Sequence, residues 1–186
     1  QEIVARNGCV LATDTDKDKA EKLFQTLPPG QLQFVPMDIS NAHSIDQAIQ
    51  TGLQKFGPVD ACVNAAYPRT TQWGTPFEEL KMEDLLENLK LQLGGAIILS
   101  QRLMKHFMSQ GHGNFIHISS IQGIAAPKFE HYEGTSMTSP IEYSAIKSGI
   151  IAMTRWMAKY HKNKNIRVNC VSPGGILDQQ PYSFLE

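Results

Sequence analysis

Short apolar runs alternate with longer stretches of helical periodicity, and this alternation restricts the fold more than any other feature of the sequence. The apolar runs have the length of strands and are Cys9–Asp14, Leu32–Ile39, Ala61–Ala66, Asn114–Ser119 and Arg167–Ser172. The helical stretches are Asp16–Thr26, Ser44–Phe56, Lys81–Met108 and Pro140–His161. Near-continuous apolar strands suit a parallel sheet that is buried on both faces. The pattern therefore predicts a doubly wound parallel α/β fold.

The length predicts one domain, because 186 residues are enough for a single sizeable core. No repeat or domain boundary interrupts 1–186. Gln1–Asn7 has the character of a helix end that Gly8 stops. In this fold a helix follows a first strand, and no closing strand follows Phe184–Glu186. We therefore expect that the first and last strands of the fold lie outside this sequence.

The composition argues against several classes of partner. The chain is 41% hydrophobic and 19% charged, with a net charge of −1, so it offers no basic field for nucleic acid or an anionic membrane. No apolar run reaches about 18 residues, and the start does not have a signal-peptide pattern. Cys9, Cys62 and Cys170 are odd in number, widely spaced and each inside an apolar run, which predicts buried, reduced thiols and a cytoplasmic protein. Neither cysteine nor histidine spacing predicts a metal site.

A tyrosine and a lysine stand four residues apart at the start of a predicted helix. Ser139, Pro140 and Glu142 fit the N-cap, first and third positions of a capping box. Tyr143 and Lys147 then lie on one face of this helix. A phenol beside an ammonium is suited to proton transfer, because the positive charge favours the phenolate. Taken alone, such a pair is more often two surface residues, so its meaning depends on the rest of the chain.

Further motifs follow the predicted strands in a fixed order, and together they resemble the classical short-chain dehydrogenase/reductase family. The motifs are Asp14, Asp38, Val63–Ala66, Ile118–Gly123, Tyr143 with Lys147, and Pro173–Gly175. The resemblance covers nearly the whole chain. It implies a Rossmann-like domain and an oxidoreductase that moves a hydride between a nicotinamide cofactor and a carbonyl or alcohol.

Two aspartates correspond to family positions that meet the adenosine half of the cofactor. Asp14 would accept both ribose hydroxyls and repel a 2′-phosphate, which favours NAD, although nearby Lys17 leaves NADP open. A competing interpretation makes Asp14 a turn residue that caps the next helix. Asp38 corresponds to the residue near the adenine amino group, and the alternative is that Asp38 or Ser40 caps the following helix.

The resemblance assigns the remaining cofactor contacts to three loops. The residues are Asn64, Ala65 and Ala66, then Tyr143 and Lys147, then Pro173, Gly174 and Ile176. Ile176 occupies the position whose backbone meets the carboxamide of the nicotinamide. A Pro-Gly pair is also a common turn, so the last loop has a purely structural alternative.

The same resemblance assigns the catalytic roles. Ser120 fixes and polarises the carbonyl oxygen, and Tyr143 donates the proton. Lys147 favours the phenolate and binds the nicotinamide ribose. The spacing from serine to Gly123 selects Ser120 over its neighbour Ser119. Gln92 stands where the family has an asparagine that holds a relay water, and it keeps the amide on a longer side chain.

Two further departures suggest a substrate class. Tyr67 replaces a family glycine, and the residues between Ser120 and Tyr143 include an inserted segment, Pro127–Thr138. Long loops of this kind are often substrate loops. With Ala66–Arg69 and Gln179–Pro181, these features resemble a subgroup linked to flagellin modification and nonulosonic-acid synthesis.

The subgroup implies a nucleotide-linked keto-sugar as substrate. Arg69 and Lys128 would then meet its diphosphate, and Tyr67 would lie beside it. The alternative is that both cations are solvated loop residues.

Other functions stay open at this point. The chain can be a reductase of 3-oxoacyl thioesters, a nucleotide-binding regulator that has lost turnover, or a dehydratase or epimerase with tightly held NAD. Joint retention of Ser120, Tyr143 and Lys147 favours an enzyme over a regulator. The resemblance also implies a homodimer or homotetramer built on the helices at Lys81–Met108 and Pro140–His161. The stripe Ile150–Trp156 serves such an interface or packing on the sheet.

Overall fold

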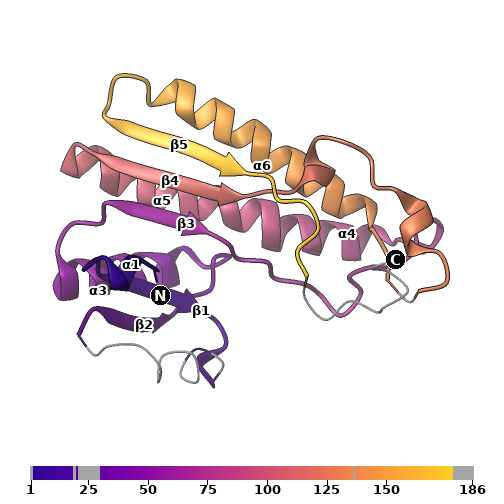
Figure 1. Ribbon diagram of the computed structural model, residues 1–186, viewed down its shortest axis with the longest axis horizontal. Helices are drawn as coiled ribbons and strands as arrows, with labels where there is room; N and C mark the ends of the chain where they lie inside the picture. The colour runs from indigo at the N-terminus through magenta and orange to yellow at the C-terminus, as the bar shows by residue number, and fades with distance from the viewer. Residues whose placement is uncertain (1, 19, 21–29, 136, 178–186) are drawn as a thin grey trace.

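The computed structural model describes residues 2–18, 20, 30–135 and 137–177. All strand pairs in it are parallel, and they form one two-stranded and one three-stranded sheet (Figure 1). The strands are β1 (Val10–Asp14), β2 (Leu32–Pro36), β3 (Ala61–Asn64), β4 (Gly113–Ile118) and β5 (Ile166–Val171). Their order, β1-β2 and β3-β4-β5, confirms the predicted parallel α/β fold. No pairing joins β1 to β3 in the described residues.

Helices connect the strands, as the alternation predicted. They are α1 (Glu2–Ala5), α3 (Ala42–Phe56), α4 (Met82–Leu89), α5 (Gly95–Gln110) and α6 (Ile141–Tyr160). The predicted helix at Lys81–Met108 is interrupted by the π-helical η2 (Lys90–Gly94), and short 3-10 turns form at η1 (Phe77–Glu79), η3 (Ile121–Gly123) and η4 (Phe129–Tyr132). Most of the predicted helix Asp16–Thr26 lies outside the described residues.

One hydrophobic core joins α3, α5 and α6 to β4 and β5. Phe107 of α5 and Phe115 of β4 are fully buried in it, as is Ile45 of α3. Burying side chains of this size stabilises the fold by about 1.5–3 kcal/mol each. Figure 1 shows α5 and α6 running beside the three-stranded sheet. These helices therefore cover one face of the sheet and hold its strands in place.

The other face of the sheet differs from the prediction of burial on both sides. Val63 of β3 is 54% exposed and Val171 of β5 is 51% exposed, whereas Phe115 is fully buried. Along β4, buried and half-buried residues alternate. Among the described residues, the core helices therefore lie against the face that Phe115 occupies, and Val63 and Val171 stay exposed.

The end of α1 confirms the predicted helix stop and changes its details. Asn7, and not Gly8, has the left-handed backbone, with φ of 62°. The Gly8 N–H donates to the Ile3 carbonyl at 2.9 Å, and the Asn7 N–H donates to the Val4 carbonyl at 3.0 Å. This is a Schellman end. Gly8 is needed for space, since a Cβ there would lie 2.6 Å from the Ile3 side chain.

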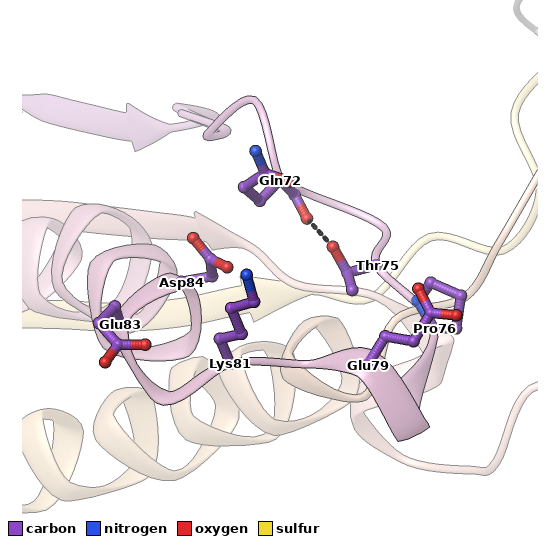
Figure 2. A pocket seen from close by; sticks show the side chains of 7 residues that line it. All are labelled: Gln72, Thr75, Pro76, Glu79, Lys81, Glu83 and Asp84. Atoms are coloured by element: carbon purple, nitrogen blue, oxygen red, sulfur yellow. Dashed lines mark hydrogen bonds between the residues drawn. The ribbon is translucent and has the colours of Figure 1, made fainter.

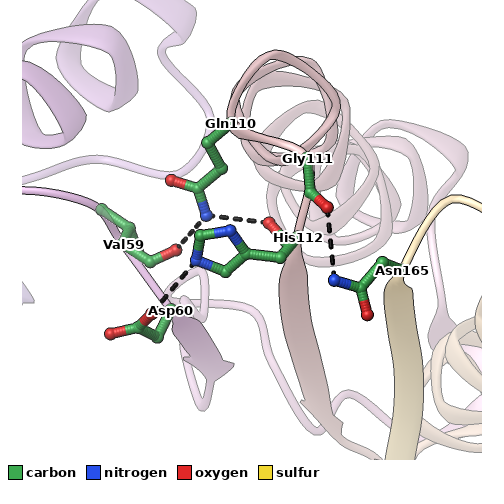
Figure 3. Close-up of polar contacts among 6 residues, drawn as sticks. All are labelled: Val59, Asp60, Gln110, Gly111, His112 and Asn165. Atoms are coloured by element: carbon green, nitrogen blue, oxygen red, sulfur yellow. Dashed lines mark hydrogen bonds and ion pairs between the residues drawn. The ribbon is translucent and has the colours of Figure 1, made fainter.

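Side-chain amides hold the loops at the amino edge of the sheet (Figure 3). The Gln110 Nε2 donates to the carbonyls of Val59 at 2.7 Å and His112 at 2.8 Å. The Asn165 Nδ2 donates to the Gly111 carbonyl at 3.3 Å. These bonds fix the segments that enter β3, β4 and β5. Because β3, β4 and β5 are parallel, their carboxyl ends meet at the opposite edge of the sheet.

The start of α6 does not form the predicted capping box. Pro140 is the N-cap residue, and no side chain caps the helix. The Ser139 hydroxyl instead donates to Gln122 Oε1 at 2.7 Å. Glu142 is 1% exposed and accepts a hydrogen bond from Asn88 at 3.4 Å. The side chains of Ser139 and Glu142 thus bond to residues of other elements, and the reciprocal bonds of a capping box do not form.

Candidate active site

The candidate catalytic residues gather at the carboxyl edge of the three-stranded sheet, where open α/β sheets bind ligands. Ser120 lies two residues after the end of β4 and caps the turn η3. This turn lies on α6, because a Cβ on Gly123 would be 2.7 Å from the Lys147 carbonyl carbon. The Ile121 N–H donates to the Pro173 carbonyl at 3.0 Å, which joins η3 to the loop after β5. The fold thus brings together three motifs that are far apart in the sequence.

The side chain of Lys147 is buried and bonded to the carboxyl end of β4. It is 6% exposed, and its Nζ donates to the Ile118 carbonyl at 3.0 Å. The same Nζ lies 5.5 Å from the centroid of the Tyr143 ring. Burial lowers the pKa of Lys147. The structure therefore places the ammonium beside the phenol, as the four-residue spacing predicted.

The two adjacent serines have different surroundings. The Ser119 hydroxyl donates to the Lys147 carbonyl at 2.8 Å, and the Ser119 N–H donates to the Val171 carbonyl at 2.7 Å. Ser119 therefore ties β4 to α6 and β5. The Ser120 Oγ accepts the Gln122 N–H at 3.2 Å, so its own hydroxyl hydrogen can be donated to a substrate oxygen. This arrangement supports the predicted choice of Ser120.

An aromatic cluster surrounds Tyr143. Tyr67, Trp73 and Tyr143 meet edge to face, with centroids 5.5 Å apart for Tyr67 and Trp73, 5.8 Å for Tyr67 and Tyr143, and 6.2 Å for Trp73 and Tyr143. The Lys147 Nζ and the Arg69 guanidinium each lie 5.4 Å from the Tyr67 centroid. Burial, followed by the charge of Tyr143, raises the pKa of Tyr67. Tyr67 consequently stays a neutral phenol.

Some members of this site were not predicted. Trp73 was missed, and the only sequence signal is a lone tryptophan in a polar loop. Asn88 is fully buried, accepts from the Thr70 hydroxyl at 3.0 Å and donates to Glu142. It therefore fixes the loop of Tyr67 against α4 and the start of α6. No periodic pattern identifies a contact of this kind.

Gln92 lies in the π-helical η2 and is 4% exposed. Its Nε2 is buried without a hydrogen-bond partner among the described residues, and so is the Oε2 of Glu142. The described contacts do not join Gln92 to Lys147. Its relay role therefore stays a prediction.

Asn64 at the end of β3 belongs to a buried chain of hydrogen bonds. Its Nδ2 lies 3.4 Å from His117 Nδ1, and its Oδ1 accepts the Ala66 N–H at 3.2 Å. His117 Nε2 lies 3.3 Å from the Ser100 Oγ, which donates to the Ala96 carbonyl at 2.6 Å. Because an amide nitrogen only donates, these contacts assign the His117 proton to Nε2. The turn at Ala65 and Ala66 is thereby anchored to the core.

His117 makes the stability of the protein depend on pH. Burial, with a smaller effect of Lys147, lowers its pKa to about 4. An unfolded histidine binds its proton near pH 6.5, so His117 contributes fully to stability above that pH and this contribution is lost as pH falls to about 4. We expect a loss of about 3 kcal/mol in unfolding free energy over this range. Urea unfolding at pH 7 and pH 4.5 measures it.

The matching variant is His117→Asn, and the control is His43→Asn at an exposed histidine of α3. The first variant should show a smaller fall in stability on acidification than the control. An equal fall in the two variants would contradict the assignment to His117.

The two aspartates near the adenosine position both make local turns. The Asp14 Oδ1 accepts the Asp16 N–H at 2.9 Å, so the turn interpretation of Asp14 is realised and leaves its other oxygen for a ribose. The Asp38 Oδ1 accepts the Ser40 N–H and hydroxyl at 2.8 and 2.7 Å. Neither Asp38 nor Ser40 caps α3, because the Asn41 side chain does. The capping alternative for Asp38 is therefore wrong.

The loop after β5 leaves room for a ligand to approach its backbone. A Cβ on Gly174 would lie 3.8 Å from Ile121 and one on Gly175 would meet nothing within 4 Å. Ile176 is 67% exposed. These residues fit the nicotinamide end of a dinucleotide. Gln179–Pro181 lie outside the described residues.

A separate polar hollow of about 740 Å³ lies between the segment that follows Trp73 and the start of α4 (Figure 2). Its lining residues are Gln72, Thr75, Pro76, Glu79, Lys81, Glu83 and Asp84. Ser120, Tyr143 and Lys147 do not line it. In the part of the chain that the structure describes, no group of three histidine, cysteine, aspartate or glutamate residues is arranged to hold a metal ion. Lys128 is exposed at the start of η4, and the described contacts do not bring it to the aromatic cluster.

Comparison with known proteins decides the family. The short chain dehydrogenase family model matches residues 1–180. The chain belongs to the short-chain dehydrogenase family. A curated relative, post-translational flagellin modification protein A of Campylobacter coli, is 45% identical over all of this short-chain dehydrogenase and 74% of its own length. The 7alpha-hydroxysteroid dehydrogenase of Bacteroides fragilis is 30% identical, over 94% of this chain and 64% of its own.

A solved structure supports the same conclusion. The short chain dehydrogenase of Leptospira borgpetersenii with bound NAD+ superimposes with a TM-score of 0.82 at 26% identity, over 99% of this chain and 68% of that one. The predicted family, Rossmann-like fold, oxidoreductase class and nicotinamide dinucleotide cofactor are thus confirmed. No helix among the described residues of this short-chain dehydrogenase is long and apolar enough to cross a membrane.

Proposed function

We propose that this short-chain dehydrogenase transfers a hydride between NAD(H) and a carbonyl or alcohol group of a nucleotide-linked sugar. The observation that carries the proposal is the line of cations and rings from Lys147 and Tyr143 through Tyr67 to Arg69. Aromatic rings offer an apolar surface to the C–H face of a sugar. The guanidinium of Arg69 presents paired donors to diphosphate oxygens. A bound sugar nucleotide would then have its carbonyl near the donor Tyr143 and its diphosphate near the donors of Arg69.

The catalytic residues divide the work at the carbonyl oxygen. The nicotinamide supplies the hydride when bound. Tyr143 donates its hydroxyl proton to the oxygen that becomes the alcohol, and the Ser120 hydroxyl donates a hydrogen bond to the same oxygen. The ammonium of Lys147 stabilises the phenolate that remains on Tyr143. In the oxidising direction the proton moves back from the alcohol to Tyr143.

The cofactor contacts are proposed residue by residue. Asp14 would hold the adenosine ribose and favour NAD, while NADP stays possible. Asp38 would lie near the adenine. The turn Asn64–Ala66, Pro173–Gly174 and the backbone of Ile176 would hold the nicotinamide half together with Lys147. The room beside Gly174 and Gly175 supports this arrangement.

A relative supports the sugar substrate, and a second candidate has its own support. The Campylobacter coli relative is named for flagellin modification. The 3-oxoacyl-[acyl-carrier-protein] reductase FabG of Thermotoga maritima is 28% identical, over 94% of this chain. Ile121, Ile124 and Phe129 follow Ser120 and are 51%, 72% and 62% exposed, which would suit an acyl chain. The second candidate is therefore reduction of a 3-oxoacyl thioester.

NADH oxidation measured with keto forms of nucleotide sugars and with 3-oxoacyl thioesters separates the two. We expect higher kcat/KM with the sugar nucleotides and a selective loss with them in Arg69→Ala. Preference for a thioester, with Arg69→Ala neutral, would favour the second candidate. NADH binding with no oxidation across the panel would favour a regulator.

We also propose an oligomeric state and a cellular location for this short-chain dehydrogenase. Residues 1–186 would form one domain of a homodimer or homotetramer in the cytoplasm. Ile150 and Ile151 are buried and Met153 packs against the core, so these members of the predicted stripe serve packing within the chain. Trp156 is 61% exposed and stacks on Tyr160 at 4.7 Å, which supports an interface on α6. The predicted burial of the cysteines is wrong, because Cys9 is exposed and Cys62 and Cys170 are half-buried, but all three are free thiols, which supports a reducing compartment.

A further inference from the structure

Gln122 is bonded to the catalytic serine on one side and to the inserted segment on the other. Its backbone N–H donates to the Ser120 Oγ at 3.2 Å. Its Nε2 donates to the Tyr132 hydroxyl at 3.1 Å, and its Oε1 accepts the Ser139 hydroxyl at 2.7 Å. Tyr132 lies in η4, within the inserted segment, and Ser139 directly precedes α6. One residue thus contacts three parts of the site.

These contacts determine how the serine hydroxyl is directed. Ser120 is 7% exposed, and the Gln122 N–H occupies one lone pair of its Oγ. The hydroxyl hydrogen is then directed away from that N–H and can reach an acceptor on the substrate. A shift of the backbone at Gln122 would move the N–H and, with it, the hydrogen of Ser120.

The carboxamide of Gln122 limits such a shift of the backbone. Two hydrogen bonds to neighbours far apart in the sequence hold it in one orientation. The same inserted segment is also joined to the loop of Trp73, because the Thr138 hydroxyl donates to the Gly74 carbonyl at 3.1 Å. The substrate-facing loops and the turn of Ser120 are therefore mechanically connected through Gln122.

We propose that Gln122 is a positioning residue, which couples the seating of η4 to the direction of the Ser120 hydroxyl. The inference rests on the proposed function, since it assumes that Ser120 polarises a substrate carbonyl. It predicts that loss of the two side-chain bonds slows turnover without weakening the cofactor. The carboxamide itself touches no reacting atom.

Gln122→Met keeps the length of the side chain and removes both bonds, and Gln122→Glu keeps acceptors for the hydroxyls of Tyr132 and Ser139. The matched control is Gln54→Met, at an exposed glutamine of α3. We expect kcat to fall about tenfold in Gln122→Met, with KM and the NADH dissociation constant nearly unchanged, because misplacement of a polarising group by a fraction of an ångström costs rate more than binding. Gln122→Glu should recover most of the rate. Tyr132→Phe should have no further effect in the Gln122→Met background.

Three results would overturn the proposal. They are a kcat of Gln122→Met equal to that of the control, parallel losses in kcat, KM, NADH affinity and melting temperature, and failure of Gln122→Glu to recover the rate. Hydrogen exchange provides a readout that does not need turnover. Gln122→Met should raise exchange both in η4 and at Ser120–Gly123, and a rise in η4 alone would reject the coupling. A wild-type protein that binds NADH but reduces no carbonyl would reject the proposed function, and the exchange result would still decide the coupling.

Discussion

Replacing Tyr143 by phenylalanine is expected to lower kcat/KM about a thousandfold and to leave the NADH dissociation constant within about twofold of the wild type. The substitution removes one hydroxyl, which is the proposed proton donor. The ring stays, so its edge-to-face contacts with Tyr67 and Trp73 are preserved. Loss of rate without loss of fold is the expected signature. Single-turnover oxidation of NADH and fluorescence titration measure the two quantities.

Tyr160→Phe is the matched control, because Tyr160 lies on the same helix and is 68% exposed. It should keep wild-type rates. If Tyr143→Phe retained most of the activity, Tyr143 would not be the proton donor. The neutral phenol of Tyr67, which lies 5.8 Å away between ring centroids, would then be the next group to test.

Replacing Lys147 by methionine is expected to lower kcat/KM about a hundredfold. Methionine fills most of the buried stem of the lysine and removes its charge. The Lys147 Nζ lies 5.5 Å from the centroid of the Tyr143 ring. At an effective dielectric constant of about 20, its charge stabilises a phenolate at this distance by about 3 kcal/mol.

The structure supplies an independent check on Lys147→Met. Lys147 is the second cause, after burial, of the lowered pKa of His117. The pKa of His117 should therefore rise from about 4 in the variant while staying below the usual value, and an NMR titration would detect this. Lys159→Met, at an exposed lysine of the same helix, is the control and should change neither property. An active Lys147→Met variant with a shifted His117 would show that the lysine is structural and not catalytic.

Much of the fold follows from local patterns. The five predicted strands and three of the four predicted helices form in the described chain, because apolar periodicity reflects which face is buried. The errors occur where tertiary contacts compete with local ones. Ser139 donates to Gln122 instead of capping α6, and Asn41 caps α3 in place of Asp38 or Ser40. A side chain that reaches a distant partner leaves no mark in the local sequence.

The candidate site shows the same division. The motif order alone predicted Ser120, Tyr143 and Lys147, and their catalytic roles stay a prediction, whereas the family that the motifs indicated is confirmed. Trp73 and Gln122 were missed as site residues, because their partners lie on other loops. Gln92 was predicted from its alignment with a family asparagine, but its buried amide has no partner that connects it to Lys147 in the described residues.

The sequence by itself determined the family, the parallel order of the strands and the spacing that puts Tyr143 and Lys147 on one face of a helix. These properties depend on short-range periodicity and on motifs that follow one another along the chain. Only the tertiary structure decided that Tyr67 lies beside this pair with Arg69 over its ring, and that Gln122 joins Ser120 to the inserted segment. Such contacts form between loops that the closing of the sheet brings together, and their geometry depends on packing that no local pattern records.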